Sequence, residues 1–274
     1  MTHSPGKRLT RTLQFSTRRF KLLQTHLAQT GKRLRVSNTA ALQARLAELV
    51  AEVEVISFDI FDTLLERIIE PPDHVKSIVC RSLAQHLKIH YEIVKDVPDL
   101  LQCRSAVETQ LRQQRQSSGF DHECRFSDIA AEMAQVILGK PDPGLTSWII
   151  AEELRTEAEV LYVKPEMDQI LAWLNSLGKR VIAISDMYLD EEHLQQLFDC
   201  KGLASHVDQI YVSSTSGVGK YSGRLFEHVL NGEKISPLQM LHIGDNHHSD
   251  HIAPAMLGIR SLWLDDKPNN RRRL

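Results

Sequence analysis

Several features are scarce or missing in this sequence, and each absence narrows the class of protein. No apolar run approaches the ~20 residues of a membrane-spanning helix, and the N-terminus lacks the apolar core of a secretory signal. The net charge is only −2, so charge gives no argument for a nucleic-acid partner. Cysteine is scarce and forms no CxxC pair, which argues against a disulfide framework or a zinc site. The cysteines are Cys80, Cys103, Cys124 and Cys200. We therefore expect a cytoplasmic protein with reduced thiols.

Positive charge is concentrated at the N-terminus. Residues 1–50 hold ten Lys or Arg and one acid, Glu48, and are interpreted as a basic N-terminal helical arm. Within 8–30, leucine and phenylalanine recur at near-helical spacing, and a further helix is predicted at about 39–51. Two interpretations stay open for 8–30: a solvated or packed helix, or an amphipathic segment that contacts an anionic membrane or a partner. Residues 267–274 form a short basic tail.

An alternation of apolar runs and amphipathic stretches begins at residue 53. Strands are predicted at Val53–Phe58, Arg180–Ser185, Gln209–Ser213, Gln239–Ile243 and Ile259–Leu264. Helices are predicted between the later ones, at Glu166–Leu177, Glu191–Phe198 and Leu225–Asn231. Strands that alternate with helices favour an α/β fold with a doubly wound parallel sheet.

Residues 70–163 interrupt this alternation. They are predicted to form helices at about 74–87, 98–116, 126–138 and 146–161. The domain organisation that follows is a core made of 51–69 and 164–266, with a helical insertion at 70–163 directly after the first strand.

Polar residues follow the predicted strands at the points where each strand ends. Asp59 follows the first strand and Ser185–Asp186 end the second, while Lys220 and the pair Asp245 and Asp250 follow the third and fourth. Ligands of open α/β sheets bind at this edge. Converging carboxylates repel unless a cation compensates them, and hard oxygen ligands suit Mg²⁺. A lysine, a hydroxyl and backbone amides could bind a phosphate, and an aspartate could attack its phosphorus.

Four motifs carry a resemblance to a known family. "SFDIFDTL", "AISD", Lys220 in "GKYSGRLF" and "GDNHHSD" occur in the order of the four motifs of the haloacid dehalogenase (HAD) superfamily. The resemblance implies a Rossmann-like core, a cap in the helical insertion and a hydrolase. The residues of these motifs are most similar to those of predicted bacterial HAD hydrolases associated with glycosyltransferases of surface polysaccharide synthesis. This similarity implies a glycosyltransferase as a partner.

The resemblance also implies roles for single residues. Asp59 would be the nucleophile and a metal ligand, and the Phe61 carbonyl and Asp245 would complete the protein ligands of Mg²⁺. Asp250 is counted with the metal site, where it would orient the metal-bound water or Lys220.

The phosphate would be bound by a second group. Ser185 and the amide of Asp186 would bind its oxygens, and Lys220 would neutralise Asp59 and the phosphoryl group. Asp59, Ser185 and Lys220 are therefore the expected catalytic residues.

Phe61 departs from the family pattern, because phosphatases of this superfamily carry an acid–base aspartate two residues after the nucleophile. Such a group contributes roughly 10²–10⁴-fold to the rate. Asp62, His247, His248 or a residue of the helical insertion could replace it, or the substrate could have a good leaving group. Alternatively, the chain is a weakly active or non-catalytic HAD-like module that binds a glycosyltransferase.

The leading prediction is a Mg²⁺-dependent phosphatase for a small phosphorylated metabolite, such as a sugar phosphate, acting through an aspartyl-phosphate on Asp59. A metal-independent 2-haloacid dehalogenase is a further alternative, since such enzymes also lack an acid at the position of Phe61. It ranks lower because Asp245 and Asp250 keep a metal-binding pattern. The sequence leaves the substrate and the oligomeric state open.

Overall fold

The computed structural model describes residues 35–265. The chain divides into two compact units, Met1–Arg35 and Val36–Leu274, and the description that follows concerns the second, together with Arg35. The predicted helix at 8–30 and the basic tail at 267–274 lie outside the described residues. The helix predicted at 39–51 is confirmed as α2, Thr39–Leu49, where the Asn38 side chain accepts a hydrogen bond from the Ala41 amide as N-cap. Among the described helices, none has the length and apolar character needed to cross a bilayer.

A six-stranded sheet forms the centre of the described region. The strands run in the order β1-β8-β7-β2-β5-β6, and β8, β7, β2, β5 and β6 pair in parallel. Their bounds are β1 Arg35–Val36, β2 Val55–Phe58, β5 Arg180–Ser185, β6 Gln209–Val212, β7 Met240–Gly244 and β8 Arg260–Leu264. The predicted parallel α/β sheet is therefore confirmed, and β2 lies between β5 and β7.

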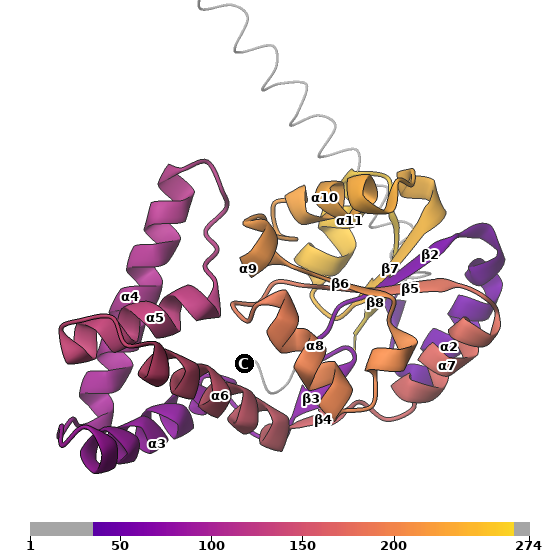
Figure 1. Cartoon of the computed structure of the whole chain (residues 1–274). Coiled ribbons are helices and arrows are strands. Elements are labelled where there is room, and N and C mark those ends of the chain that lie inside the picture. The colour runs from indigo at the N-terminus through magenta and orange to yellow at the C-terminus, as the bar shows by residue number, and fades with distance from the viewer. Residues whose placement is uncertain (1–34, 266–274) are drawn as a thin grey trace, which may run out of the picture. The chain divides into compact units, whose positions relative to one another are not determined.

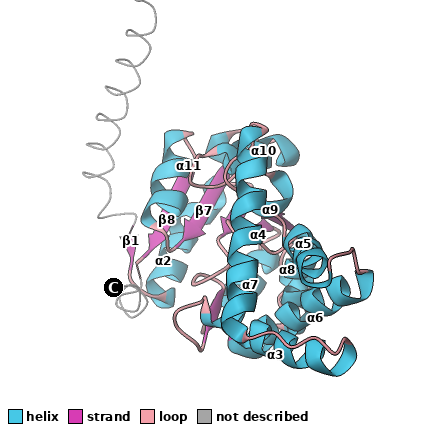
Figure 2. Ribbon diagram, turned by 90° about the vertical axis from the view of Figure 1, so that its left-hand side faces the viewer, coloured by secondary structure: helices cyan, strands magenta, loops and turns pink. Residues whose placement is uncertain are grey.

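Helices cover both faces of this sheet. Figure 1 shows α10 (Arg224–Glu233) and α11 (Ala253–Met256) on one side of the strands, and α2, α7 (Met167–Ser176) and α8 (Glu191–Cys200) on the other. Figure 2 shows the same arrangement after a quarter turn. Every residue of β2 is buried, which is why its sequence is a nearly continuous apolar run. Short helical turns are η1 Val50–Glu52, η2 Ala204–His206, α9 Ser213–Ser216, η3 Pro237–Gln239 and the π-helix η4 His247–Ile252.

Four consecutive helices between β2 and β5, termed here the helical block, span residues 74–160. They are α3 His74–His90, α4 Val97–Ser117, α5 Phe126–Leu138 and α6 Pro143–Val160. The chain enters and leaves the block through an antiparallel ribbon of β3 (Leu65–Arg67) and β4 (Leu161–Val163). The four helices match the predictions for 70–163, whereas the ribbon was not predicted.

Two buried ion pairs are associated with the helical block. The Arg104 guanidinium donates to both oxygens of Glu153, at 2.6 and 2.7 Å, and the Tyr188 hydroxyl donates to the same carboxylate at 2.6 Å. Arg67 of the ribbon likewise donates to both oxygens of Glu157, at 3.1 and 2.9 Å. Each buried cation therefore faces one carboxylate in the two-point geometry that compensates best for lost hydration.

Candidate functional site

The polar residues at the strand ends meet in one cavity. Asp59 directly follows β2, Ser185 ends β5, Asp245 directly follows β7, and Lys220 follows β6 and α9. All of them line a cavity of about 160 Å³. Its lining residues are Asp59, Phe61, Asp62, Ser185, Asp186, Lys220, Asn246, Ser249, Asp245 and Asp250. The structure thus brings together all the residues to which the sequence analysis assigns a nucleophilic, phosphate-binding or metal-binding role.

Lys220 is the centre of the hydrogen-bond network in this cavity. Its Nζ donates to Oδ1 of Asp59 at 2.5 Å and to Oδ1 of Asp250 at 2.6 Å, and its backbone amide donates to Oδ1 of Asp186 at 2.7 Å. Burial alone would lower the pKa of Lys220, but Asp250, Asp59 and Asp186 outweigh burial and raise it. The lysine therefore carries a fixed positive charge beside Asp59.

Asp250 is held in place by three groups. Besides Lys220, the His242 ring lies 3.1 Å from its Oδ1 and the Asn246 amide donates to its Oδ2 at 2.9 Å. Burial would raise the pKa of Asp250, but Lys220 and His242 outweigh burial and hold the pKa well below its ordinary value. The carboxylate lies so close to Gly244 that a Cβ there would overlap with Cγ of Asp250. This close approach explains why the residue before Asp245 is glycine.

His242 is not among the candidate site residues named from the sequence. The residue is fully buried, its Nδ1 lies 2.8 Å from the Ser57 hydroxyl, and its Nε2 faces Asp250. Ser57 and His242 thus connect the interior of the sheet to the cavity. Each of these residues is a polar side chain within an apolar strand. The sequence alone does not show that Ser57 of β2 and His242 of β7 lie opposite each other.

The carboxylates of Asp59, Asp245 and Asp250 can present oxygens within 4.8 Å of one another. Burial raises the pKa of Asp59 well above its ordinary value, and the charges of Asp250 and Asp245 add to that rise while Lys220 opposes it. Three carboxylates thus lie near one lysine side chain, and two of them, Asp59 and Asp250, are buried. Since the donors are hard oxygens, this cluster fits Mg²⁺.

Phe61 lines the cavity at the position where a phosphatase of this superfamily would carry its acid. The Arg67 guanidinium carbon lies 4.3 Å from the centre of the Phe61 ring, and Arg67 is itself paired with Glu157. The phenylalanine therefore packs against a buried ion pair of the ribbon, and no proton donor is present at this position.

Among the side chains considered as substitutes, Asp62 lines the cavity. His247 packs instead against Trp263, with ring centres 4.6 Å apart, and His248 packs against Tyr221 at 4.2 Å. Neither histidine belongs to the cavity lining. Asp62 has a positive φ of 63°, which is tolerated well by aspartate, and its carbonyl accepts a hydrogen bond from Lys164 at 3.1 Å.

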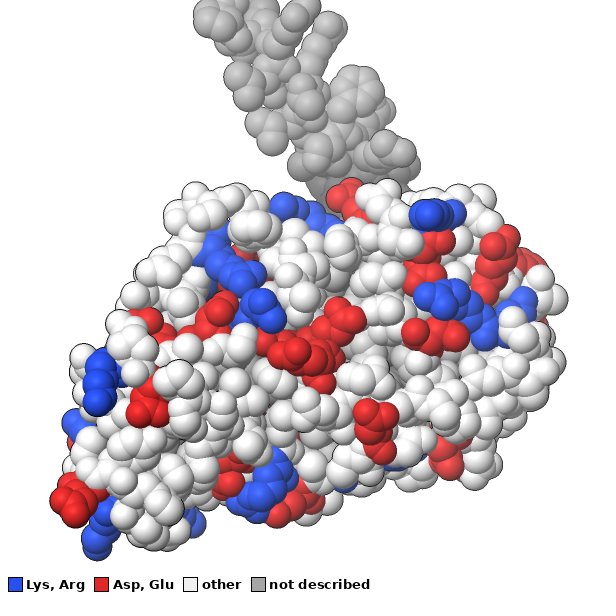
Figure 3. Space-filling model, viewed as in Figure 1, with Lys and Arg blue, Asp and Glu red and all other residues white. Residues whose placement is uncertain are grey.

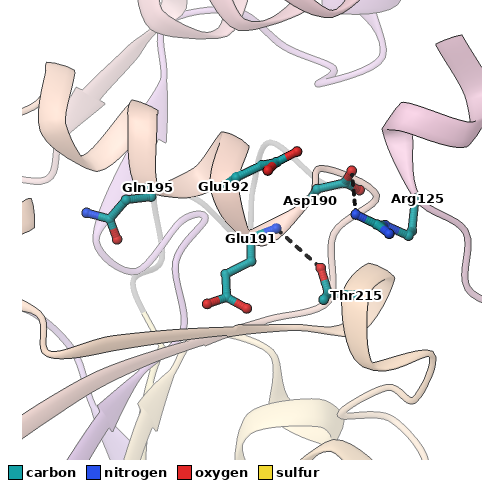
Figure 4. Close-up of a pocket in the computed structure, with 6 residues that line it drawn as sticks. All are labelled: Arg125, Asp190, Glu191, Glu192, Gln195 and Thr215. Atoms are coloured by element: carbon teal, nitrogen blue, oxygen red, sulfur yellow. Dashed lines mark hydrogen bonds and ion pairs between the residues drawn. The ribbon is translucent and has the colours of Figure 1, made fainter.

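A second group of possible metal ligands lies at the N-terminus of α8, where Asp190 and Glu192 line a cavity of about 390 Å³. Asp190, Glu192 and His193 can present ligand atoms within 4.8 Å of one another. However, the His193 Nδ1 accepts a hydrogen bond from the Asp190 amide at 3.2 Å, which leaves the proton of the neutral ring on Nε2. Figure 4 shows Arg125 reaching Asp190 across this cavity, at 3.3 Å. We interpret the cluster as a structural contact that attaches the start of α5 to the loop after β5.

Charged side chains of both signs lie close together on the surface. On the face that Figure 3 draws, acidic side chains gather near the middle, with basic side chains beside them. The residues around the second cavity include Glu191 and Glu192 together with Arg125. This face therefore offers no extended surface of one sign, as a net charge of −2 suggests.

Comparisons with known proteins agree with this architecture. A family model described as haloacid dehalogenase-like hydrolase matches residues 53–258. A phosphoserine phosphatase from Thermus thermophilus is 33% identical over 116 residues, which is 42% of this chain and 46% of that protein. Haloacid dehalogenase-like hydrolase domain-containing protein 3 from Xenopus laevis is 27% identical over 103 residues, 38% of this chain and 41% of that protein. The chain thus spans less than half the length of these relatives.

Solved structures share the fold. A 2-haloacid dehalogenase from Pseudomonas syringae pv. Tomato DC3000 superposes with a TM-score of 0.56 at 18% identity, over 77% of this chain and 86% of that one. A HAD phosphatase from Thermococcus onnurineus gives a TM-score of 0.50 at 13% identity, over 78% and 86%. At such identities the likeness concerns the fold alone. Because the family model covers most of the chain and the four motifs meet in one cavity, this protein belongs to the haloacid dehalogenase-like hydrolases.

Proposed function

We propose that this hydrolase is a Mg²⁺-dependent phosphatase that acts on a small phosphorylated metabolite through an aspartyl-phosphate on Asp59. The observation that carries the proposal is the pairing of Asp59 with Lys220 at 2.5 Å, inside a cavity that also holds Asp245 and Asp250. A nucleophile beside a fixed cation and a metal-binding cluster suits an anionic phosphoryl group better than an uncharged substrate.

In the proposed reaction, a carboxylate oxygen of Asp59 attacks the phosphorus atom in line with the leaving oxygen. An O–P bond to Asp59 forms, the bond to the leaving oxygen breaks, and that oxygen departs with its electron pair and takes up a proton. Water then hydrolyses the acyl phosphate, which releases inorganic phosphate and regenerates Asp59. Lys220, Ser185 and the Asp186 amide would hold the phosphoryl oxygens.

Asp59, Asp245 and the Phe61 carbonyl would hold Mg²⁺, with Asp250 positioning Lys220. Bound Mg²⁺ would offset the negative charge that gathers on the phosphoryl oxygens. Burial raises the pKa of Asp59 although Lys220 opposes the rise, so a further cation bound beside Asp59 would favour the ionised form that attacks.

The proton for the leaving oxygen has no donor at position 61. Asp62 lines the same cavity and is the candidate among the residues named above. A substrate with a good leaving group, such as an acyl or aryl phosphate, would need no such acid. We therefore expect faster turnover of these phosphates than of sugar phosphates.

The helical block would act as the cap that selects the substrate. A sugar phosphate and a glycosyltransferase partner rest on the family resemblance. Peripheral membrane contact concerns residues 8–30, which lie outside the described region.

The test is a substrate panel assayed with Mg²⁺ and with EDTA. Aryl phosphate, acetyl phosphate, sugar phosphates and 2-haloacids are incubated with the wild type, with Asp59→Asn and with Asp99→Asn as a control on the exposed surface of α4. We expect phosphate release that EDTA abolishes and that falls by at least ~10³-fold in Asp59→Asn. Asp99→Asn should match the wild type.

Two other results would replace this proposal. Halide release from 2-haloacids that EDTA does not affect would indicate a dehalogenase. Tight binding of a phosphorylated ligand with no turnover of any substrate would indicate a non-catalytic binding module.

A further inference from the structure

Asp121, in the loop between α4 and α5, contacts the segment that carries Lys220. Its Oδ2 accepts hydrogen bonds from the Gly219 amide at 2.8 Å and from the Ser222 hydroxyl at 2.6 Å. Its Oδ1 accepts from the Arg224 guanidinium at 2.8 Å. One side chain of the helical block therefore binds donors on both sides of Lys220 in the sequence.

The backbone and the neighbouring side chain strengthen this contact. The Asp121 amide donates to the Gly217 carbonyl at 2.9 Å, and Arg224 also donates to the Gly119 carbonyl. The Phe120 ring lies so close to Gly217 that a Cβ there would be 2.5 Å from a ring carbon. Gly217 also has a φ of +72°, so this position needs glycine for both reasons.

Asp121 is ionised at neutral pH. Burial would raise its pKa, but the hydrogen bonds from Ser222, Gly219 and Arg224 outweigh burial and lower the pKa. Its hydrogen bonds to the Lys220 segment are therefore charge-assisted and stronger than neutral ones.

Two carboxylates thus hold consecutive backbone amides. Asp121 binds the amide of Gly219, and Asp186, which directly follows β5, binds the amide of Lys220. Asp186 is attached to the sheet, whereas Asp121 comes from the helical block. The side chain of Lys220 then extends to Asp59 and Asp250.

We propose that Asp121 is a positioning residue through which the helical block fixes the Lys220 segment, so that Lys220 is aligned with Asp59 only while loop 118–125 is docked. The proposal rests on the proposed function in taking Lys220 as the phosphate-binding lysine. Docking of the block would then complete the catalytic site.

The first measurement needs no turnover. Hydrogen–deuterium exchange of the full-length protein is followed by mass spectrometry for peptides within 213–224, in the wild type, Asp121→Ala, Asp121→Asn and Glu159→Ala. Glu159 is the matched control, because it is an acid of the same block that pairs with Arg155 within α6. We expect Asp121→Ala to speed exchange in these peptides by ~10-fold or more, with little change in Glu159→Ala.

The Asp121→Asn variant separates positioning from general stability. Its amide side chain keeps an oxygen that can accept from the Gly219 amide but loses the charge that Arg224 binds, so exchange should lie between the wild type and Asp121→Ala. With a phosphate substrate and Mg²⁺, Asp121→Ala should lower kcat by ~10-fold or more, with a smaller change in KM, because Lys220 acts most strongly on charge that develops in the transition state.

Unchanged exchange in 213–224 for Asp121→Ala would overturn the proposal, whatever the activity of the wild type. Equal acceleration in Glu159→Ala would also overturn it, because the effect would then be general loosening of the block. If Asp121→Ala does not fold, Arg224→Met replaces it and removes the ion pair from the other side. Exchange in these peptides should then rise, and its constancy would count against the proposal.

Discussion

The helical block and the sheet edge both bury charged side chains, but they do so in opposite ways. In the block, Arg104 binds both oxygens of Glu153, and Arg67 of the adjoining ribbon binds both oxygens of Glu157. At the carboxyl ends of the strands, one lysine, Lys220, donates to the side chains of both Asp59 and Asp250, and Asp186 accepts from its amide. The first region is balanced in charge, and the second has an excess of acid.

We infer from this difference that the paired charges stabilise the fold, whereas the charges around Lys220 serve the proposed reaction. A balanced pair needs no further partner and loses stability when one member is removed. An acidic excess is unfavourable in the metal-free protein and becomes favourable when a cation binds. The site is therefore recognised by its imbalance of charge rather than by burial alone.

The largest effect on stability is expected from breaking a balanced pair. Arg104→Met leaves the fully buried Glu153 without its cation and should lower the free energy of unfolding by ~3–5 kcal/mol, measured by guanidinium denaturation. The Tyr188 hydroxyl compensates only part of this loss. A variant as stable as the wild type would show that Glu153 does not need Arg104 to compensate its charge.

Two controls define this result. Arg104→Met combined with Glu153→Gln should lose less stability than the single variant, because no unpaired charge stays buried. Arg260→Met removes the partner of Glu52 in an exposed ion pair and should change stability by less than ~1 kcal/mol.

A smaller effect of opposite sign is expected from removing an acid of the excess. Asp245→Asn should raise the stability of the EDTA-treated protein by about 1 kcal/mol, since it relieves repulsion with Asp59. In the wild type, Mg²⁺ at about 100 times its Kd should add ~2.7 kcal/mol, and this gain should be lost in the variant. Thermal unfolding with Mg²⁺ and with EDTA measures both quantities.

An equal Mg²⁺-dependent rise in the melting temperature of Asp245→Asn and the wild type would contradict the assignment of this cluster as a metal site. Destabilisation of the EDTA-treated variant would show instead that Asp245 serves a structural contact and that its charge is compensated without a metal.

The smallest effect is expected at the boundary of the two regions. Phe61→Asp places a carboxylate beside Arg67, which lies 4.3 Å from the ring of the phenylalanine. Arg67 would keep this carboxylate ionised, so we expect at most a ~5-fold gain in kcat for sugar phosphates, far below the roughly 10²–10⁴-fold of a working general acid. Steady-state kinetics measure kcat for sugar phosphates, and kcat for an aryl phosphate, which needs no acid, is the reference.

The combination of Phe61→Asp with Arg67→Met and Glu157→Gln removes the neighbouring ion pair without leaving a buried charge. A further gain in kcat is expected in this triple variant. A large gain in Phe61→Asp alone would show that Arg67 does not control the position.

The sheet and the cavity could be predicted because their signals are local. An apolar run followed by Asp59, or by Ser185 and Asp186, specifies both a strand and the polar group at its end. Since parallel strands end at one edge, the meeting of these residues follows from the fold class. The four helices of the block were likewise visible from their own apolar periodicity.

Contacts between the regions could not be predicted in the same way. Asp121 and Gly219 are about 100 positions apart, and so are Arg67 and Glu157, with no local pattern that pairs them. The ribbon of β3 and β4 was missed because strands of three residues are too short to show a period of two. The packing of Phe61 against Arg67 is likewise a contact that no local pattern indicates.

The ribbon of β3 and β4 also has a consequence for how the family can diversify. The two chain crossings leave from adjacent paired residues, Arg67 and Leu161. The segment between them can therefore be lengthened, shortened or exchanged like a cassette, without shifting the register of the sheet that aligns the catalytic groups. A replacement segment would still have to supply an acceptor for the Gly219 amide, as Asp121 does.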